Sequence, residues 1–296
     1  MSAVDIALPA SRARTLFEAL RPRQWTKNLL LFAGLLFAAK LGDATRWLEA
    51  LAAFGVYSAG SSAAYLVNDV RDAEHDRAHP LKRARPIASG RLSPRIALWA
   101  AGALACAAVG GAVALGPWSA AFLCGFLALQ MAYTAGLKHI VLIDVLAIGG
   151  LFVVRAAAGA EAVDVRISPW LLICTALLAL FLALAKRRAE LVLVGAEETP
   201  SRTALEGYSL ALVDQLVSIV AASTVIAYSL YTVTARDSKA MMATIPFVLY
   251  GVFRYLLLLH RRELGEEPEN VLLTDGPLLA TVAAWAATSA AILAAT

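Results

Sequence analysis

Three oxygen-bearing side chains are regularly spaced in one charged segment of the sequence. Asn68, Asp72 and Asp76 stand four residues apart, so on a helix they share one face with a drift of about 40° per step. Carboxylate and amide oxygens gathered in this way suit Mg²⁺, which proteins usually bind through one or two carboxylates together with substrate phosphate oxygens. The spacing therefore predicts a magnesium site. Because Asp69 lies about 100° round the helix from Asn68, Asp69→Asn is expected to reduce activity less than Asp72→Asn or Asp76→Asn.

A cluster of basic residues follows these carboxylates along the chain. Lys82, Arg83 and Arg85 lie close together between Pro80 and Pro86. Carboxylates beside such a cluster make chemical sense when an anionic ligand bridges the two through a metal ion. The alternative is a solvated loop with helix-capping aspartates, which leaves the regular spacing to accident.

Three further segments carry groups that can bind phosphate. In one of them Lys186 and Arg187 precede Glu190, although a plain helical ion pair between Lys186 and Glu190 explains that patch equally well. The other two segments supply a tyrosine and two lysines: Lys27, Tyr133 and Lys138.

The composition requires that membrane helices position these polar groups. Of the 296 residues, 60% are hydrophobic and only 16% are charged, whereas soluble domains carry about 25% charged residues. Each bilayer crossing by a helix needs about 20 predominantly apolar residues. We therefore predict an all-α, polytopic membrane bundle of about nine spans, at residues 29–41, 47–67, 95–115, 118–135, 140–160, 170–185, 211–235, 241–259 and 278–295.

Prolines and basic residues refine this topology. Pro94, Pro117, Pro169 and Pro277 stand at or near the start of a span, where the missing amide proton costs nothing. Nineteen of the 26 Lys and Arg residues fall in alternate connections and only five in the others. The positive-inside rule then places the N-terminus and the charged connections in the cytoplasm. We expect residues 1–20 to form a cytoplasmic segment and residues 21–296 to form a single membrane domain.

Two charged residues fall inside one predicted span. Asp144 lies one turn into it, which makes the acid a functional candidate, although a helix N-terminus also accommodates a carboxylate. Arg155 lies near the other end of the span and is expected to snorkel toward the membrane surface. The sequence shows no paired charges near the membrane midplane, which argues against a transporter.

The pattern N-x-x-x-D-x-x-x-D after the second span resembles the UbiA-type membrane prenyltransferase superfamily. Longer strings are similar to one branch of it, the decaprenyl-phosphate phosphoribosyltransferases: RPRQWTKN at 21–28, YLVNDVRDAEHD at 65–76, KRARPIASG at 82–90, YTAGLKH at 133–139 and KRRAEL at 186–191. In the wider superfamily, enzymes that use prenyl diphosphates carry a second D-x-x-x-D after the sixth span. No such pair occurs here between Lys186 and Asp214, and Lys186, Arg187 and Glu190 occupy that place.

The resemblance implies an enzyme of the plasma membrane that makes cell-envelope precursors. Its reaction would be the Mg²⁺-dependent transfer of 5-phosphoribosyl from phosphoribosyl diphosphate to a polyprenyl phosphate. No nucleic acid is expected as a partner, and the oligomeric state is left open. The implied metal ligands are Asn68, Asp72 and Asp76, and the implied catalytic residues are Asp72, Asp76, Lys186 and Glu190. The implied substrate-binding residues are Lys27, Lys82, Arg83, Arg85, Tyr133, Lys138 and Arg187.

Two other functions stay open at this point. One is the transfer of an isoprenyl chain from its diphosphate to a small acceptor, against which the missing second aspartate pair argues. The other is a membrane transporter or a scaffold for anionic lipids, against which the regular carboxylate spacing argues.

Overall fold

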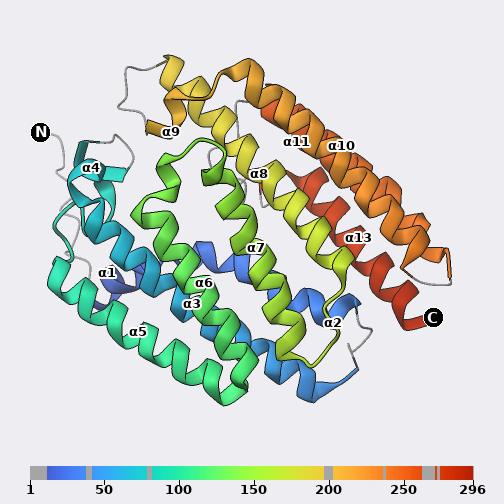
Figure 1. Ribbon diagram of the computed structural model, residues 1–296, viewed down its shortest axis with the longest axis horizontal. Coiled ribbons are helices and arrows are strands. Elements are labelled where there is room, and N and C mark those ends of the chain that lie inside the picture. Colours follow the sequence, from blue (N-terminus) through green and yellow to red (C-terminus); the bar gives the residue numbers. More distant parts are fainter. Residues whose placement is uncertain are drawn as a thin grey trace, which may run out of the picture.

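The computed structural model describes residues 12–37, 42–78, 82–196, 203–235, 238–261, 271 and 274–295, and every regular element within them is a helix (Figure 1). The α-helices and 3₁₀ helices (η) are, in chain order, α1 (Arg12–Ala19), η1 (Pro22–Phe32), α2 (Ala33–Phe37), α3 (Ala44–Arg71), α4 (Ala73–Ala78), η2 (Lys82–Ala84), α5 (Pro94–Leu115), α6 (Pro117–Ala135), η3 (Leu137–His139), α7 (Ile143–Ala162), α8 (Pro169–Ala196), α9 (Thr203–Glu206), α10 (Leu210–Thr234), η4 (Ala240–Thr244), α11 (Ile245–Arg261) and α13 (Gly276–Ala295).

Eight helices of the described residues are long and apolar enough to cross a membrane. They are α3, α5, α6, α7, α8, α10, η4 continued by α11, and α13. Each coincides with one predicted span, so the prediction of an all-α, polytopic bundle is confirmed. Pro94, Pro117 and Pro169 are the first residues of α5, α6 and α8, as their lack of an amide proton led us to expect.

The remaining predicted span, 29–41, has a different structure. Its first part belongs to η1 and continues into the short helix α2, while residues 38–41 lie outside the described residues. An eleven-residue 3₁₀ helix is unusual, because runs longer than three or four residues are uncommon. The count of nine spans is therefore approximate.

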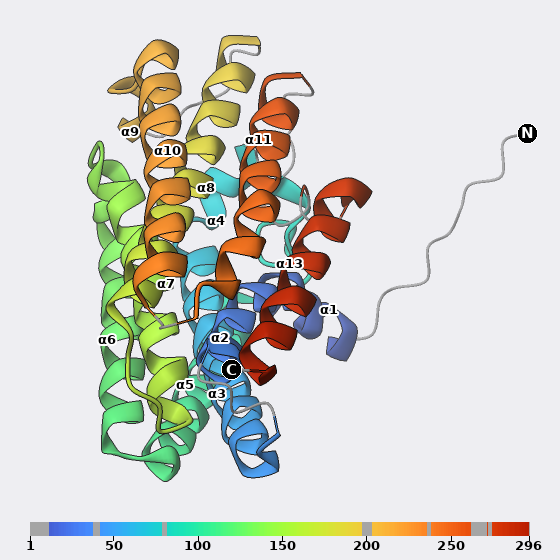
Figure 2. The same ribbon diagram turned by 90° about the vertical axis from the view of Figure 1, so that its right-hand side faces the viewer.

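Helix α7 lies in the middle of the view in Figure 1 and packs against α6 and α8, which run beside it in Figures 1 and 2. Near its start Val145 belongs to an apolar cluster shared with α8, α10 and α11. Further along, Leu151 and Ala158 belong to a second cluster shared with η1, α3, α5 and α6. The helix therefore joins the two halves of the molecule. Helix α4, helix α9 and the α6–α7 connection lie toward the same end of the bundle in Figure 1.

Small residues let η1 and α2 approach α7 closely. A Cβ atom added to Gly159 would lie 2.3 Å from the backbone oxygen of Leu31, and one added to Gly34 would lie 2.9 Å from the Cα atom of Ala160. Helices in lipid commonly associate through such small residues.

We expect Gly159→Ala to destabilise the protein, because the new methyl group meets backbone that cannot move aside. Overpacking of this kind typically costs about 1–3 kcal/mol, which should appear as a lower unfolding temperature of detergent-solubilised protein. Gly102→Ala is the matched control, since a Cβ there meets nothing within 4 Å. Equal unfolding temperatures for the two variants would contradict the close packing of η1 on α7.

Candidate functional site

The predicted acidic pattern spans the junction between α3 and α4. Helix α3 ends at Arg71, and Asp72 has φ −89° and ψ 4° before α4 begins. The amide of Asp72 donates to the carbonyl of Asn68, and the amide of Asp76 donates to the carbonyl of Asp72, both at 2.8 Å. The four-residue spacing is therefore kept in the backbone across the junction. The Asp76 side chain is buried, and that of Asp72 is 23% exposed.

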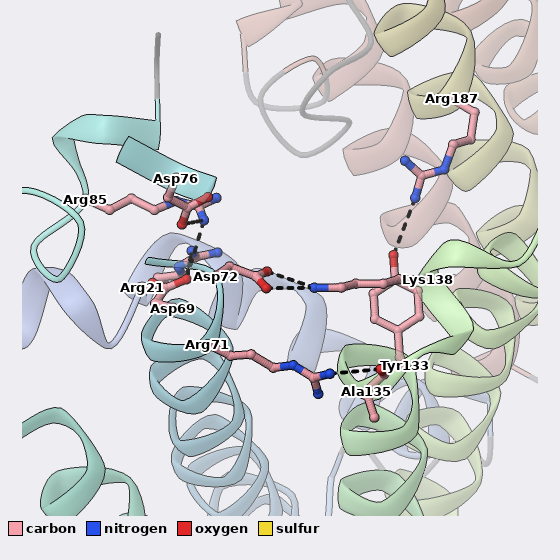
Figure 3. Close-up of polar contacts among 10 residues, drawn as sticks. All are labelled: Arg21, Asp69, Arg71, Asp72, Asp76, Arg85, Tyr133, Ala135, Lys138 and Arg187. Carbon is pink, nitrogen blue, oxygen red and sulfur yellow. Dashed lines mark hydrogen bonds and ion pairs between the residues drawn. The ribbon is translucent and has the colours of Figure 1, made fainter. Parts of the chain in front are cut away.

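Each carboxylate of this pattern contacts a basic residue from another segment (Figure 3). Lys138 of η3 is buried, and its Nζ lies 3.0 and 2.8 Å from the two carboxylate oxygens of Asp72. Nη1 of Arg85 lies 2.6 Å from Oδ2 of Asp76. Because all four groups are charged, these are the stronger, charge-assisted kind of hydrogen bond. Basic side chains are therefore already held against the acidic pattern.

Asp69, at which the sequence predicts a milder effect of substitution, also contacts a residue of this site. Its side chain is only 3% exposed and pairs with Arg21, and Nη1 of Arg85 lies 3.5 Å from its Oδ1. Arg85 therefore contacts both Asp69 and Asp76. The physical reason is that Arg85 returns toward α3 from the segment after α4, and it approaches both faces of the α3–α4 junction. Arg21, which directly precedes η1, is a site residue that the sequence analysis did not single out.

A second charged cluster surrounds Arg187 on α8. Its Nε donates to Oδ2 of Asp144 at 2.7 Å, and both side chains are buried. Arg187 also pairs with Glu190, and its Nη2 lies 3.4 Å from the hydroxyl of Tyr133 on α6. A helical ion pair with Lys186 alone therefore does not account for Glu190, because Glu190 also pairs with Arg187. Because buried charges must be compensated, Asp144 and Glu190 explain how a buried guanidinium is tolerated here.

The remaining predicted substrate-binding residues, together with Lys186, are basic side chains on η1, η2 and α8. Nζ of Lys27 on η1 lies 2.5 Å from Oε1 of Gln24. Lys82 is half-buried and Arg83 is exposed on η2, while Lys186 is half-buried on α8. The structure thus brings Arg85 into the acidic cluster and leaves Arg83 at the surface.

Arg155 is buried rather than snorkelling, which corrects the expectation from sequence. Its Nε donates to Oδ1 of Asn28 at 2.9 Å, and Nη1 donates to the carbonyl of Leu151 at 3.3 Å. The guanidinium lies over the rings of Phe126 and Phe152, 4.5 and 5.3 Å from their centroids. These contacts replace solvation of the charge at the membrane surface. The sequence places Asn28 directly before the first predicted span, but it gives no indication that Asn28 contacts Arg155.

Among the described residues, no three His, Cys, Asp or Glu side chains are gathered closely enough to hold a metal by themselves. Two carboxylates and one amide from Asn68, Asp72 and Asp76 nevertheless fit Mg²⁺, which keeps water and substrate phosphate oxygens in its coordination shell. The donor chemistry therefore fits a metal that is completed by a substrate.

Fold and site together define a polytopic membrane protein with a charged site at one end of its helical bundle. The chain belongs to the UbiA prenyltransferase family, whose model matches residues 28–274.

Two bacterial relatives match almost the whole chain. A decaprenyl-phosphate phosphoribosyltransferase of Mycobacterium tuberculosis is 36% identical, over 97% of this chain and 96% of the relative. The enzyme of the same name from Corynebacterium glutamicum is 33% identical, over 94% of this chain and 86% of the relative.

Among solved structures, a UbiA homolog from Archaeoglobus fulgidus bound to GPP and Mg²⁺ has the same fold. Its TM-score is 0.73 and its identity is 16%, over 95% of this chain and 100% of that structure. At this identity the likeness concerns the fold alone.

Proposed function

We propose that this protein transfers 5-phosphoribosyl from phosphoribosyl diphosphate to the phosphate of a polyprenyl phosphate and releases diphosphate. The observation that carries the proposal is the cluster around Arg187, in which a buried cation stands where prenyl-diphosphate users would place a second aspartate pair. A cation binds phosphate directly. The reaction has three phosphate-bearing groups to hold, namely the two of the donor and the one of the acceptor. The names of the two bacterial relatives support the same reaction.

The acidic pattern supplies the proposed metal site. Asp72 and Asp76, with Asn68, would hold Mg²⁺, which when bound neutralises the diphosphate of the donor and stabilises its departure. The three side chains follow one another at four-residue intervals across the α3–α4 junction. With two carboxylates instead of the four of two aspartate pairs, less metal charge would be held at the site. Basic side chains would then neutralise more of the phosphate charge.

Lys138 and Arg85 are proposed to exchange partners when substrate binds. Each contacts a carboxylate of the acidic pattern, so each lies beside the proposed metal site. If Asp72 and Asp76 held the metal, Lys138 and Arg85 would be available to pair with phosphate oxygens of the substrates instead. Charges held in place beforehand need little reorganisation in the transition state.

The chemical step needs little proton transfer. An oxygen of the lipid phosphate forms a bond to C1 of the ribose, the bond from C1 to the diphosphate oxygen breaks, and diphosphate leaves with the electron pair. The lipid phosphate is already an anion at neutral pH, so no strong base is required. Negative charge grows on the diphosphate as C1 becomes oxocarbenium-like, and fixed cations should supply most of the catalysis.

The basic residues are proposed to divide the phosphate groups among themselves. Those after α4 would bind the 5-phosphate of the donor: Lys82, Arg83 and Arg85. Those of η1 and α8 would bind the diphosphate and the acceptor phosphate: Lys27, Lys186 and Arg187. Three others would position these groups through contacts already described: Tyr133, Lys138 and Glu190.

The location of the site follows from the same proposal. The eight apolar helices make the chain a multi-pass membrane protein. We propose that it lies in a bacterial plasma membrane with the charged end of the bundle in the cytoplasm, because the Lys and Arg residues concentrate in the connections at that end.

Release of diphosphate by the purified protein tests this function. With Mg²⁺, phosphoribosyl diphosphate and a polyprenyl phosphate, we expect diphosphate release. Lys186→Ala should raise KM for a phosphorylated substrate roughly tenfold or more, the usual effect of losing a charge-assisted contact. Lys239→Ala is the control, since Lys239 precedes η4 and contacts the carbonyl of Val233, away from the proposed site. Release from a prenyl diphosphate and an aromatic acceptor, with phosphoribosyl diphosphate inert, would overturn the proposal.

A further inference from the structure

The segment 203–209, between α8 and α10, reaches across the bundle to the start of α7. Its residues Ala204, Leu205 and Tyr208 are buried, and helix α9 within it packs against η3, which carries Lys138. A Cβ atom added to Gly207 would lie 2.4 Å from Cγ2 of Val141. The absence of a side chain at Gly207 therefore allows the segment to lie directly on the α6–α7 connection.

The hydroxyl of Tyr208 makes two hydrogen bonds at this contact. It donates to Oδ1 of Asp144 at 2.7 Å and accepts from the amide of Leu142 at 2.8 Å. Asp144 uses its other oxygen, Oδ2, for Arg187. Tyr208 and Arg187 therefore hold the two oxygens of one buried carboxylate.

The backbone at Leu142 shows that this arrangement is imposed by its surroundings. Leu142 has φ 67° and ψ −39°, and a bulky residue with positive φ is strained. Such strain persists where neighbouring contacts fix the conformation. The hydrogen bond to Tyr208 is one such contact, and it also satisfies an amide next to the N-terminus of α7, where helices leave amides unpaired.

We propose that Tyr208 is a positioning residue, which fixes the Asp144 carboxylate so that this carboxylate orients Arg187 toward Tyr133 and the phosphate-binding end of the bundle. Its role rests on the proposed function of Arg187. Burial and the hydrogen bond to Asp144 raise the pKa of the Tyr208 phenol above its ordinary value. The phenol thus stays protonated and remains a donor to Asp144 throughout the neutral range.

Removing only the hydroxyl tests this proposal. We expect Tyr208→Phe to lower kcat/KM for phosphoribosyl transfer roughly tenfold, the usual effect of losing a hydrogen bond to a charged group. Tyr228→Phe is the matched control, because Tyr228 is also buried and its hydroxyl bonds to Thr244 and Trp285, which lie outside the charged clusters. The control should leave kcat/KM close to that of the wild type.

A double-variant cycle separates positioning from a general structural role. Arg187→Lys keeps a cation beside Asp144 but removes the planar group that Asp144 orients. If Tyr208 acts through Arg187, adding Tyr208→Phe to Arg187→Lys should cost less than threefold instead of tenfold. A full tenfold loss in that background would overturn the proposal, as would an unchanged kcat/KM in Tyr208→Phe alone.

Two further outcomes are also decisive. A Tyr208→Phe protein that fails to fold, while Tyr228→Phe folds, would overturn positioning in favour of a purely structural role. If the wild-type protein showed no phosphoribosyl transfer, the proposed function would be overturned. If the wild type were active and Tyr208→Phe were equally active, only the role of Tyr208 would be overturned.

Discussion

Asp72→Asn or Asp76→Asn should lower turnover by about 10²–10³-fold, because each would remove a charged ligand from the proposed metal site, which would stabilise the departing diphosphate. Asn keeps the size of the side chain and one oxygen acceptor, so the protein should still fold and insert. Glu74→Gln is the matched control, since Glu74 is an exposed residue of α4 outside the four-residue pattern. Turnover should be measured by diphosphate release at saturating substrate, with and without a chelator of divalent metals.

Asp69→Asn should be nearly as harmful, although a straight helix would place Asp69 off the acidic face. Asp69 is buried against Arg21 and Arg85, and Arg85 also contacts Asp76. Equal turnover in Glu74→Gln and Asp72→Asn would show that the acidic pattern does not take part in catalysis. Full activity of the wild type in the presence of a chelator would show that the reaction needs no divalent metal.

Arg187→Ala should prevent accumulation of folded protein, because it leaves Asp144 buried without its cation. Breaking a buried ion pair by removing one partner typically costs about 3–5 kcal/mol, and Asp144 is fully buried. The double variant Asp144→Asn with Arg187→Met removes both charges. It should therefore recover most of the folded yield and unfolding temperature while remaining inactive, which separates folding from phosphate binding.

Arg91→Ala is the control for this experiment. Arg91 also pairs with a carboxylate, that of Glu18, but both side chains are 40% or more exposed. Exposed pairs contribute about 1 kcal/mol or less, so this variant should fold normally. An Arg187→Ala protein as stable as Arg91→Ala would show that the Asp144–Arg187 pair does not hold the bundle together.

Local patterns in the sequence predicted the helices and the polar end of the bundle. Proline marks the first residue of three membrane helices, because its missing amide proton and fixed φ favour that position. The acidic spacing survives the α3–α4 junction, because the backbone hydrogen bonds continue across it. These features depend on residues within a few positions of one another.

Partners that are distant in the sequence could not be predicted in the same way. Arg155 forms a hydrogen bond with Asn28, which is 127 positions away in the sequence, and Tyr208 forms one with Asp144, which is 64 positions away. Helical periodicity gives the face on which a residue lies but not the helix that packs against that face. For the same reason the burial of Asp69 was missed, since it depends on Arg85 returning to α3 after α4. The roles assigned to the individual site residues stay predictions.

The chemical identity of the lipid product tests the central claim most directly. Purified protein should be incubated with Mg²⁺, phosphoribosyl diphosphate and a polyprenyl phosphate, and the extracted lipid analysed by mass spectrometry. We expect a lipid heavier than the acceptor by one 5-phosphoribosyl group. It should form in a one-to-one ratio with released diphosphate, and it should not form when a chelator of divalent metals is present. Phosphoribosyl transfer would be contradicted if the polyprenyl phosphate stayed unmodified and the protein instead prenylated a small aromatic acceptor when supplied with a prenyl diphosphate.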